Sequence, residues 1–238
     1  MFRCWASVIL ALIVTATYVT SLPGSYAIQR RASKCNGYQD LCNRKYSNVT
    51  HIGAHDSFAV GKLGSLGSNQ EANVTVQLED GIRLLQIQTH ASSGHQDSNP
   101  SGLSLCHTSC ALKNGGTLES YLRQVKQFLN QNKNEVVTLV ITNPDNKPVS
   151  NFAKAFENTG LNSMAYRANS NSISKNDWPT LQELISQNQR VVVFLDYKAD
   201  VNQAKYILPE FQNIWENPYD QTSSNFNCTP CLLYTSDA

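Results

Sequence analysis

The fold is decided by the stretch His51-Ile-Gly-Ala-His-Asp-Ser-Phe58. The segment before it, Tyr46–Thr50, has β-strand composition, so it predicts an apolar strand that runs into small residues and ends at His55-Asp56. In a parallel β/α barrel, active-site residues sit at that end of a strand. Because a histidine exchanges protons near neutral pH, His55 is a candidate general base. The alternative is a loop histidine followed by a helix-capping aspartate.

Length and charge place the chain among ordinary globular proteins. It has 238 residues, enough for one large domain with a hydrophobic core, and a formal net charge of +1. The sequence has no strongly basic region, which a nucleic-acid partner would require. It also has no acidic run of the kind that indicates a disordered tail. We therefore expect a monomeric globular protein with no nucleic-acid partner.

The N-terminus has the features of a secretory signal peptide covering residues 1–27. Arg3 supplies positive charge, Trp5–Val19 is largely apolar, and Ser21–Ala27 supplies small residues for cleavage. A membrane anchor is the alternative, but the apolar run is short for the ~20 residues that cross a bilayer. We expect a secreted or extracellular protein, with cell-surface attachment left open, whose residues 28–34 are processed or flexible. N-glycosylation sequons are present at Asn48, Asn73 and Asn227.

The cysteines fit an oxidising compartment, where an even count indicates disulfides. Cys4 leaves with the signal peptide, and six of the seven cysteines remain. Short loops predict a disulfide between Cys35 and Cys42 and another between Cys106 and Cys110. Zinc is the alternative, but no Cys/His set has convincing ligand spacing. We expect no metal and no cofactor.

The rest of the chain alternates strand and helix patterns. Expected strands cover 82–89, 103–107, 135–142, 163–166 and 190–195, and expected helices cover 74–79, 117–130, 149–158 and 178–185. With the strand before His55 this makes about six strands, mostly separated by helices. The pattern predicts an α/β fold, a distorted (β/α)8 TIM barrel truncated at its C-terminus. A doubly wound open sheet is the alternative, but no Gly-rich phosphate loop follows the first strand.

Polar residues at strand ends give further site candidates. Gln86 and Gln88 alternate with apolar residues, so they share one face of the second strand. His107 ends the third strand as His55 ends the first. The Gly/Ser-rich loop over 59–69 is expected either to cover or line a site or to be only a flexible connection. The candidates outside the first strand are Gln86, Gln88, His90, His107, Asp196 and Lys198.

The last residues, Cys231–Ala238, break the preceding composition and resemble translated adapter read-through. We interpret them as a non-native tail, which makes 35–230 an incomplete barrel domain. On this interpretation Cys228 pairs with a cysteine that the sequence does not contain.

Four motifs occur in order along the chain: Asn48–Ser57, Gly81–Gln86, Leu105–Cys110 and Val192–Tyr197. Together they resemble secreted fungal proteins of the phospholipase C-like phosphodiesterase superfamily, related to the X domain of phosphatidylinositol-specific phospholipase C. The resemblance runs from about Cys35 to Cys228. It implies a distorted (β/α)8 barrel with its site at the strand C-termini.

The resemblance also implies a mechanism. In active relatives one histidine takes the proton of the inositol 2-hydroxyl, which attacks phosphorus, and a second histidine protonates the departing glycerol oxygen. His55 matches the base, His107 the acid, and Asp56 the aspartate that orients the second histidine. In-line displacement independently needs a base and an acid on opposite sides of phosphorus. We expect a phosphoric diester hydrolase acting on a phosphoinositide, another phospholipid or a related phosphodiester.

The second strand departs from these relatives. The bacterial enzymes place an arginine there, and the metal-dependent animal enzymes place calcium-binding carboxylates. Gln86 and Gln88 are neutral amides, which replace neither. We assign them to substrate binding together with His90, Asp196 and Lys198.

The charge that should stabilise the transition state must therefore come from elsewhere. Lys198, His90 and Arg83 are candidates, although an ordinary ion pair is the favoured interpretation of Arg83. Asp196 has a turn-capping alternative. A catalytically silent barrel that binds a lipid head group or glycan is the alternative function. A glycerophosphodiesterase-like or sphingomyelinase D-like enzyme would need acidic metal ligands that the second strand lacks.

Overall fold

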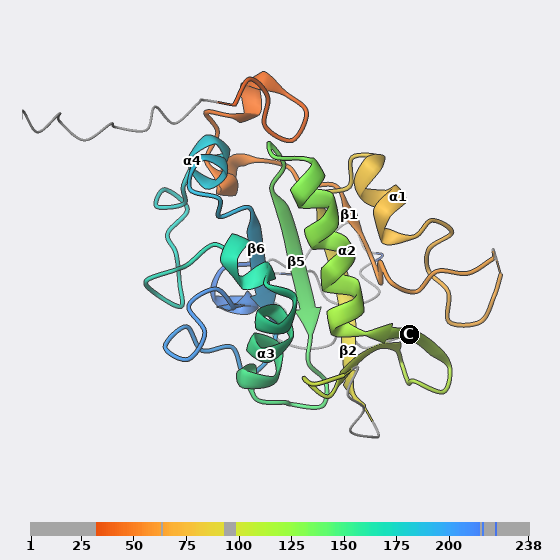
Figure 1. Cartoon of the computed structure of the whole chain (residues 1–238). Coiled ribbons are helices and arrows are strands. Elements are labelled where there is room, and N and C mark those ends of the chain that lie inside the picture. The colour runs from red at the N-terminus through yellow and green to blue at the C-terminus, as the bar shows by residue number, and fades with distance from the viewer. Residues whose placement is uncertain (1–31, 63, 93–98, 215, 217–221, 223–238) are drawn as a thin grey trace, which may run out of the picture.

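The computed structural model describes residues 32–62, 64–92, 99–214, 216 and 222 (Figure 1). The expected signal peptide, most of the 28–34 segment, Asn227, Cys228 and the 231–238 tail lie outside these residues. The described residues form a mixed α/β fold around a seven-stranded sheet.

The sheet has the strand order β4-β3-β2-β5-β6-β7, and β1 also pairs with β2. Neighbouring strands β1, β2, β5, β6 and β7 pair in parallel, whereas β3 is antiparallel to β2 and to β4. The strands are β1 (Gly53–Ala54), β2 (Leu84–Ala91), β3 (Leu103–His107), β4 (Lys113–Thr117), β5 (Val137–Thr142), β6 (Val191–Leu195) and β7 (Leu208–Pro209). The helices are α1 (Val74–Glu79), α2 (Leu118–Gln131), α3 (Val149–Thr159) and α4 (Leu181–Ser186).

The sequence located most of these elements. The strand over 103–107 and the helix over 74–79 are confirmed with the same bounds, and the main helices and parallel strands lie within a few residues of expectation. The expected barrel is represented by a mixed sheet of seven strands rather than about six.

Two expected strands are displaced or shortened in the structure. The strand before His55 is only β1 (Gly53–Ala54), and within 163–166 only Ala165 forms a bridge, parallel to Val191. Tyr46–Thr50 begins with the 3-10 helix η2 (Tyr46–Asn48), because the Tyr46 ring is buried against Trp178 and its hydroxyl bonds to Thr138 Oγ1 at 2.6 Å. The 163–166 segment overlaps the 3-10 helix η3 (Leu161–Met164), which follows a left-handed turn that ends α3.

Two strands were missed. β4 has the sequence Lys-Asn-Gly-Gly-Thr, which lacks the branched and aromatic residues typical of strands. It forms as the second strand of a hairpin with β3, and Gly115 packs so closely on Phe58 that a Cβ would lie 2.5 Å from the ring. β7 is only two residues long.

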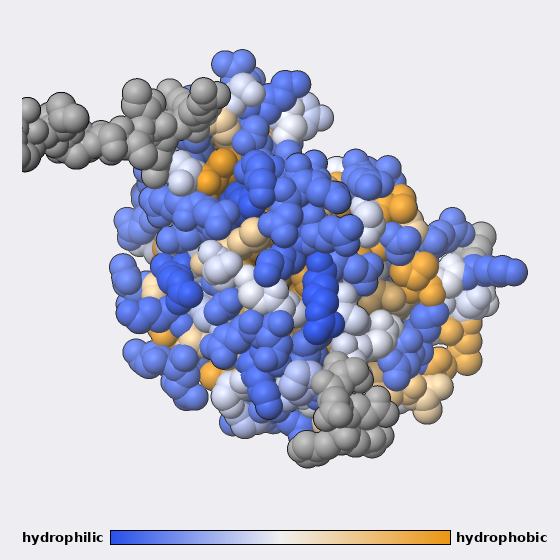
Figure 2. Space-filling model, in the orientation of Figure 1, coloured by the Kyte–Doolittle hydropathy of each residue, from blue (hydrophilic) through white to orange (hydrophobic). Residues whose placement is uncertain are grey.

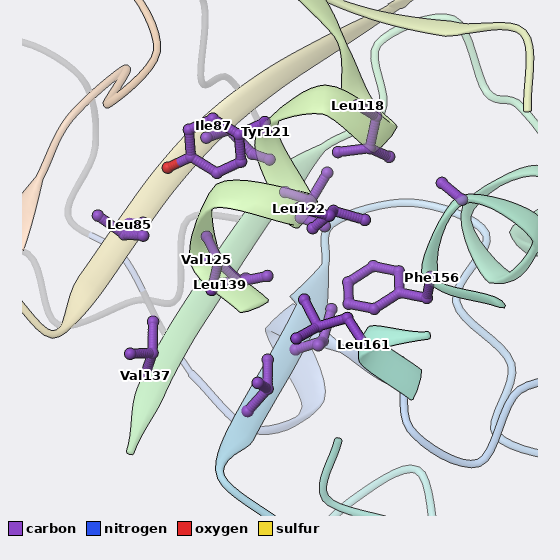
Figure 3. Close-up of a cluster of buried hydrophobic side chains, with 14 of the residues drawn as sticks. Leu85, Ile87, Leu118, Tyr121, Leu122, Val125, Val137, Leu139, Phe156 and Leu161 are labelled. Atoms are coloured by element: carbon purple, nitrogen blue, oxygen red, sulfur yellow. The ribbon is translucent and has the colours of Figure 1, made fainter. Parts of the chain in front are cut away.

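One face of the sheet carries α2 and α3 (Figure 1). The apolar stripe predicted on α2 packs on alternate residues of β2 and β5, as Figure 3 shows for Leu122, Val125, Leu85 and Leu139. The exposed sides of these helices are mainly hydrophilic (Figure 2). The pattern of period 3.6 on the helix therefore matches the pattern of period two on the strands.

The opposite face has its own apolar cluster. Val140, Val192 and Phe194 of the sheet pack there with Trp178 and with residues of α4. The Cys35–Cys42 disulfide belongs to this cluster, and the Cys106–Cys110 disulfide joins β3 to the segment that follows it, so both predicted pairs are confirmed.

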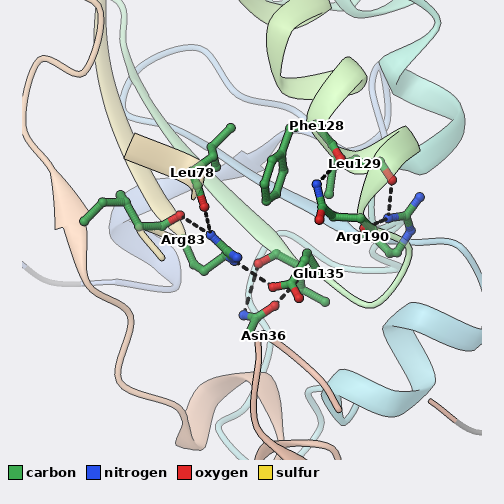
Figure 4. A network of polar contacts seen from close by, with 10 residues as sticks. Asn36, Leu78, Arg83, Phe128, Leu129, Glu135 and Arg190 are labelled. Atoms are coloured by element: carbon green, nitrogen blue, oxygen red, sulfur yellow. Dashed lines mark hydrogen bonds and ion pairs between the residues drawn. The ribbon is translucent and has the colours of Figure 1, made fainter. Parts of the chain in front are cut away.

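Charged residues at the N-terminal ends of the strands form a closed network (Figure 4). Arg83 pairs with Glu135 at 2.8 Å, donates to the Leu78 carbonyl and lies 5.0 Å over the Phe128 ring. The buried Arg190 donates to two carbonyls at the end of α2. Arg83 thus forms a structural ion pair at the end of the sheet opposite His55, which agrees with the favoured interpretation of an ordinary ion pair.

Candidate active site

Two strands of opposite direction end against each other beside β2. β1 pairs in parallel with Leu84 and Leu85, whereas β3 pairs antiparallel with the far end of β2, at Thr89, His90 and Ala91. β1 therefore runs up one side of β2 while β3 runs down the same side toward it. The residues at their C-terminal ends meet beside the middle of β2.

A single carboxylate joins the two histidines found there. Asp56 Oδ2 lies 3.2 Å from His55 Nε2 and 3.4 Å from His107 Nε2. The Asp56 side chain is only 2% exposed, whereas that of His55 is 66% exposed and that of His107 is 12% exposed. The structure thus brings together the predicted base, acid and aspartate around one oxygen atom.

The surroundings of His107 suit a proton donor. Its Nδ1 lies 3.1 Å from the carbonyl oxygen of Gly67, and its Nε2 faces Asp56. Both partners are acceptors, so each ring nitrogen of His107 lies beside an oxygen that can accept a proton-bearing nitrogen. A leaving-group oxygen would have to take the place of one of these acceptors.

The Gly/Ser-rich loop after β1 lines this site. Asn69 Nδ2 donates to Asp56 Oδ2 at 3.3 Å, and Gln70 Nε2 donates to the His55 carbonyl at 2.5 Å. Gly67 packs against the β3–β4 hairpin, where a Cβ would lie 3.1 Å from Leu112 and Lys113. The loop and the adjoining Gln70 therefore contact His55, Asp56 and His107.

Gln86 and Gln88 also lie beside the two histidine segments, but their side-chain amide oxygens accept backbone N–H groups. Gln86 Oε1 accepts the Asp56 N–H and Gln88 Oε1 accepts the Thr108 N–H, each at 2.7 Å. Asp56 and Thr108 both have left-handed backbone, with φ of 41° and 59°. The two glutamines thus hold the two residues that follow the histidines.

The other candidates lie apart from this group. His90 Nδ1 is 3.2 Å from Asp145 Oδ1. Asp196 Oδ1 accepts the N–H groups of Asn143 and Tyr197, which fits the turn-capping interpretation. Burial raises the pKa of Asp196 to about 6. Lys198 is exposed, with a left-handed φ of 64°.

Sequence reasoning missed Lys113. In the β3–β4 ladder it is the direct partner of His107, so the two side chains start from neighbouring positions, and its ammonium donates to the Val60 carbonyl. The Cys106–Cys110 pair was the available signal, because a short disulfide loop after one strand favours a returning strand. Asn69 gave no signal, because a polar residue in a polar loop is unremarkable.

Among the described residues, no three His, Cys, Asp or Glu side chains are grouped so that they could hold a metal ion. In the same part of the chain, no helix has the length and apolar character needed to cross a membrane.

Comparisons with known proteins identify the family of this chain. Residues 41–233 match the family described as PI-PLC X 1. Two relatives come from the fungus Arthroderma benhamiae. An "uncharacterized secreted protein" is 45% identical over 82% of this chain and 42% of its own length, and a "PI-PLC X domain-containing protein 1" is 41% identical over 91% of this chain and 67% of its own length.

A solved structure of phosphatidylinositol-specific phospholipase C from Staphylococcus aureus has the same fold. The TM-score is 0.53 at 17% identity, over 73% of this chain and 56% of that one. At this identity the likeness supports the fold alone. This chain spans less than half of the secreted relative's length, so it corresponds to only part of that protein.

Proposed function

We propose, because this chain belongs to the PI-PLC X domain family, that it is a secreted phosphoric diester hydrolase acting on a phosphoinositide or a related phosphodiester. The observation that carries the proposal is the Asp56 oxygen shared by His55 and His107. The fungal relative named as secreted and the signal-peptide pattern of residues 1–27 support secretion. We further propose that 35–230 belongs to a barrel that closes in the longer natural protein.

The proposed reaction needs two proton transfers. His55, the more exposed ring, accepts the proton of the inositol 2-hydroxyl as its oxygen attacks phosphorus. The bond between phosphorus and the glycerol oxygen breaks, and His107 gives that oxygen its proton. The products are a cyclic inositol phosphodiester and a diacylglycerol, and the Asp56 carboxylate offsets the imidazolium charge throughout.

The negative charge that develops on phosphorus needs a cation. Lys113 is the proposed source, because it is the cross-strand partner of His107. Lys198 is a second candidate at the strand ends, whereas Arg83 lies at the far end of the sheet. Calcium does not fit, because the carbonyl oxygens of Gln86 and Gln88 already accept backbone N–H groups.

The test is release of water-soluble inositol phosphate from phosphatidylinositol vesicles by the secreted chain. We expect His55→Ala and His107→Ala each to lower release by roughly 10² to 10⁴-fold while vesicle binding is retained. Addition of EDTA should leave release unchanged. Lys45→Ala, at an exposed position near the N-terminal ends of the strands, is the matched control.

The silent barrel remains the second candidate, and the amides at 86 and 88 favour it over a metal-dependent enzyme. Vesicle binding without release by the unmodified chain would establish that candidate. Release that persists in His55→Ala would contradict the assignment of that residue as the base.

A further inference from the structure

The two histidine segments are built alike, although they lie on strands of opposite direction. In each, the residue directly after the histidine is a non-glycine in the left-handed region, Asp56 after His55 and Thr108 after His107. Left-handed backbone is unfavourable for residues with a Cβ and most of all for β-branched ones such as Thr108. Such a conformation persists only where its surroundings hold it in place.

Here the surroundings are one pair of side chains on β2. Gln86 accepts the N–H of Asp56 and Gln88 accepts the N–H of Thr108, both at 2.7 Å. The glutamines are two residues apart on the same strand face, so their attachment points are roughly 7 Å apart along a rigid element. β2 is paired on both sides, with β5 along one edge and with β1 and β3 along the other.

We propose that Gln86 and Gln88 are positioning residues that fix how the two histidines face the Asp56 carboxylate. Gln86 holds the turn after the base and Gln88 holds the turn after the acid, so one strand sets the geometry of both. The expected effect on turnover rests on the proposed function, whereas the effect on the orientation of the histidines does not.

The chemistry of the amide explains why glutamine fits both positions. An arginine has no acceptor atom, so it cannot bind either N–H group. A glutamate would accept, but at position 86 it would add a second negative charge beside the buried Asp56. Glutamine accepts the N–H and stays neutral.

The test changes Gln88, whose side-chain oxygen accepts the Thr108 N–H. The side chain of Thr108 is exposed, so Thr108 itself can also be substituted. Gln88→Leu removes the acceptor at similar volume, and we expect kcat to fall about 10²-fold with KM within about threefold. Gln88→Glu keeps an acceptor and should retain most of the turnover. Gln182→Leu, on α4 at the other end of the sheet, is the matched control.

A second substitution separates positioning from substrate contact. Glycine adopts the left-handed conformation without strain, so Thr108→Gly in the Gln88→Leu background should restore kcat by about tenfold. A rise in KM that this second change does not rescue would mean that Gln88 binds substrate. A loss of thermal stability with unchanged kcat would mean that the bond is structural only.

The His107 ring gives a readout that does not depend on the substrate. In ¹⁵N NMR spectra the Nε2 signal reports the proximity of the Asp56 carboxylate, and Gln88→Leu should move it toward the signal of a ring without that partner, whereas Gln88→Glu should not. An unmoved signal in Gln88→Leu overturns the proposal. If the unmodified chain releases no inositol phosphate, the proposed reaction fails while this signal still decides the positioning role.

Discussion

The two ends of the sheet differ in how their charged side chains are paired and in which residues have left-handed backbone. At the N-terminal end the charged side chains have complete sets of partners: Arg83 has Glu135 and two carbonyls, and Arg190 has the end of α2. The left-handed residues near this end are Asn36 and Asn188, and asparagine tolerates that backbone well.

At the C-terminal end the left-handed positions include Thr108 and Lys198, which tolerate this backbone less well, as well as Asp56 and Asn146. The Asp56 carboxylate is buried, and its Oδ1 has no hydrogen-bond partner among the described residues. The difference teaches where the chain gives up stability. The N-terminal end holds the sheet together, and the C-terminal end carries left-handed residues and a buried charge.

The largest effect that would break this comparison is expected from Asp56→Asn. The change removes the shared charge, so activity on phosphatidylinositol should fall by roughly 10² to 10³-fold. Stability should stay equal or rise, because burying a carboxylate with an unpartnered oxygen is costly. Turnover and thermal unfolding of the same preparation check both parts. A destabilised but active variant would place Asp56 with the structural residues.

Arg190→Met should give the opposite result. It leaves two carbonyls at the end of α2 without a donor in a buried place, so we expect a loss of about 3 kcal/mol in the free energy of unfolding. Activity per folded molecule should not change. Urea unfolding measures the loss, and a large fall in kcat of the folded variant would show that the two ends are coupled.

Asp196→Asn sharpens the comparison through pH. Burial first, and the nearby Glu216 carboxylate as well, raise the pKa of Asp196 to about 6, so the folded state binds a proton more tightly than the unfolded chain. That proton favours folding below about pH 4 and is lost as the pH rises through about 6. Asparagine keeps the acceptor oxygen without the charge. We therefore expect the variant to be more stable than the unmodified chain by about 2 kcal/mol at pH 8, with little difference at pH 4.

Unfolding curves at the two pH values provide the check. An equal difference at both pH values would mean that ionisation of Asp196 does not oppose folding.

The smallest effect concerns the left-handed residues themselves. Thr108→Gly should raise the free energy of unfolding by up to about 1 kcal/mol, because it relieves strain and loses only an exposed side chain. Asn188→Gly should lower it, because the asparagine accepts a hydrogen bond from Arg190. Opposite signs in thermal unfolding confirm the comparison, and the same sign for both contradicts it.

Hydrophobic periodicity in the sequence predicted the helices and strands whose formation depends mainly on their own residues. The apolar stripe of α2, the buried run of β5 and the short strand β3 were all visible in the sequence. β4 was not, because its residues become a strand only by pairing with β3. The Tyr46 segment was misjudged for the same reason, since a tertiary contact decides its conformation.

In the candidate site, too, the sequence predicted the residues but not the tertiary contacts between them. The order and identity of His55, Asp56 and His107 could be taken from motifs, but the antiparallel approach of β3 that brings His107 to Asp56 could not. The glutamines were assigned to substrate because they share a strand face. Their contacts with backbone depend on the register of three strands, which composition does not encode.

The most direct test of the account follows the phosphorus product over time. We would record ³¹P NMR spectra of phosphatidylinositol vesicles with the unmodified chain and with His107→Ala. The account predicts that a cyclic inositol phosphodiester forms first with the unmodified chain and that His107→Ala forms it at least 10²-fold more slowly. The same cyclic product at the same rate from His107→Ala, or a non-cyclic phosphate as the first product, would contradict the pairing of two histidines around Asp56 as base and acid.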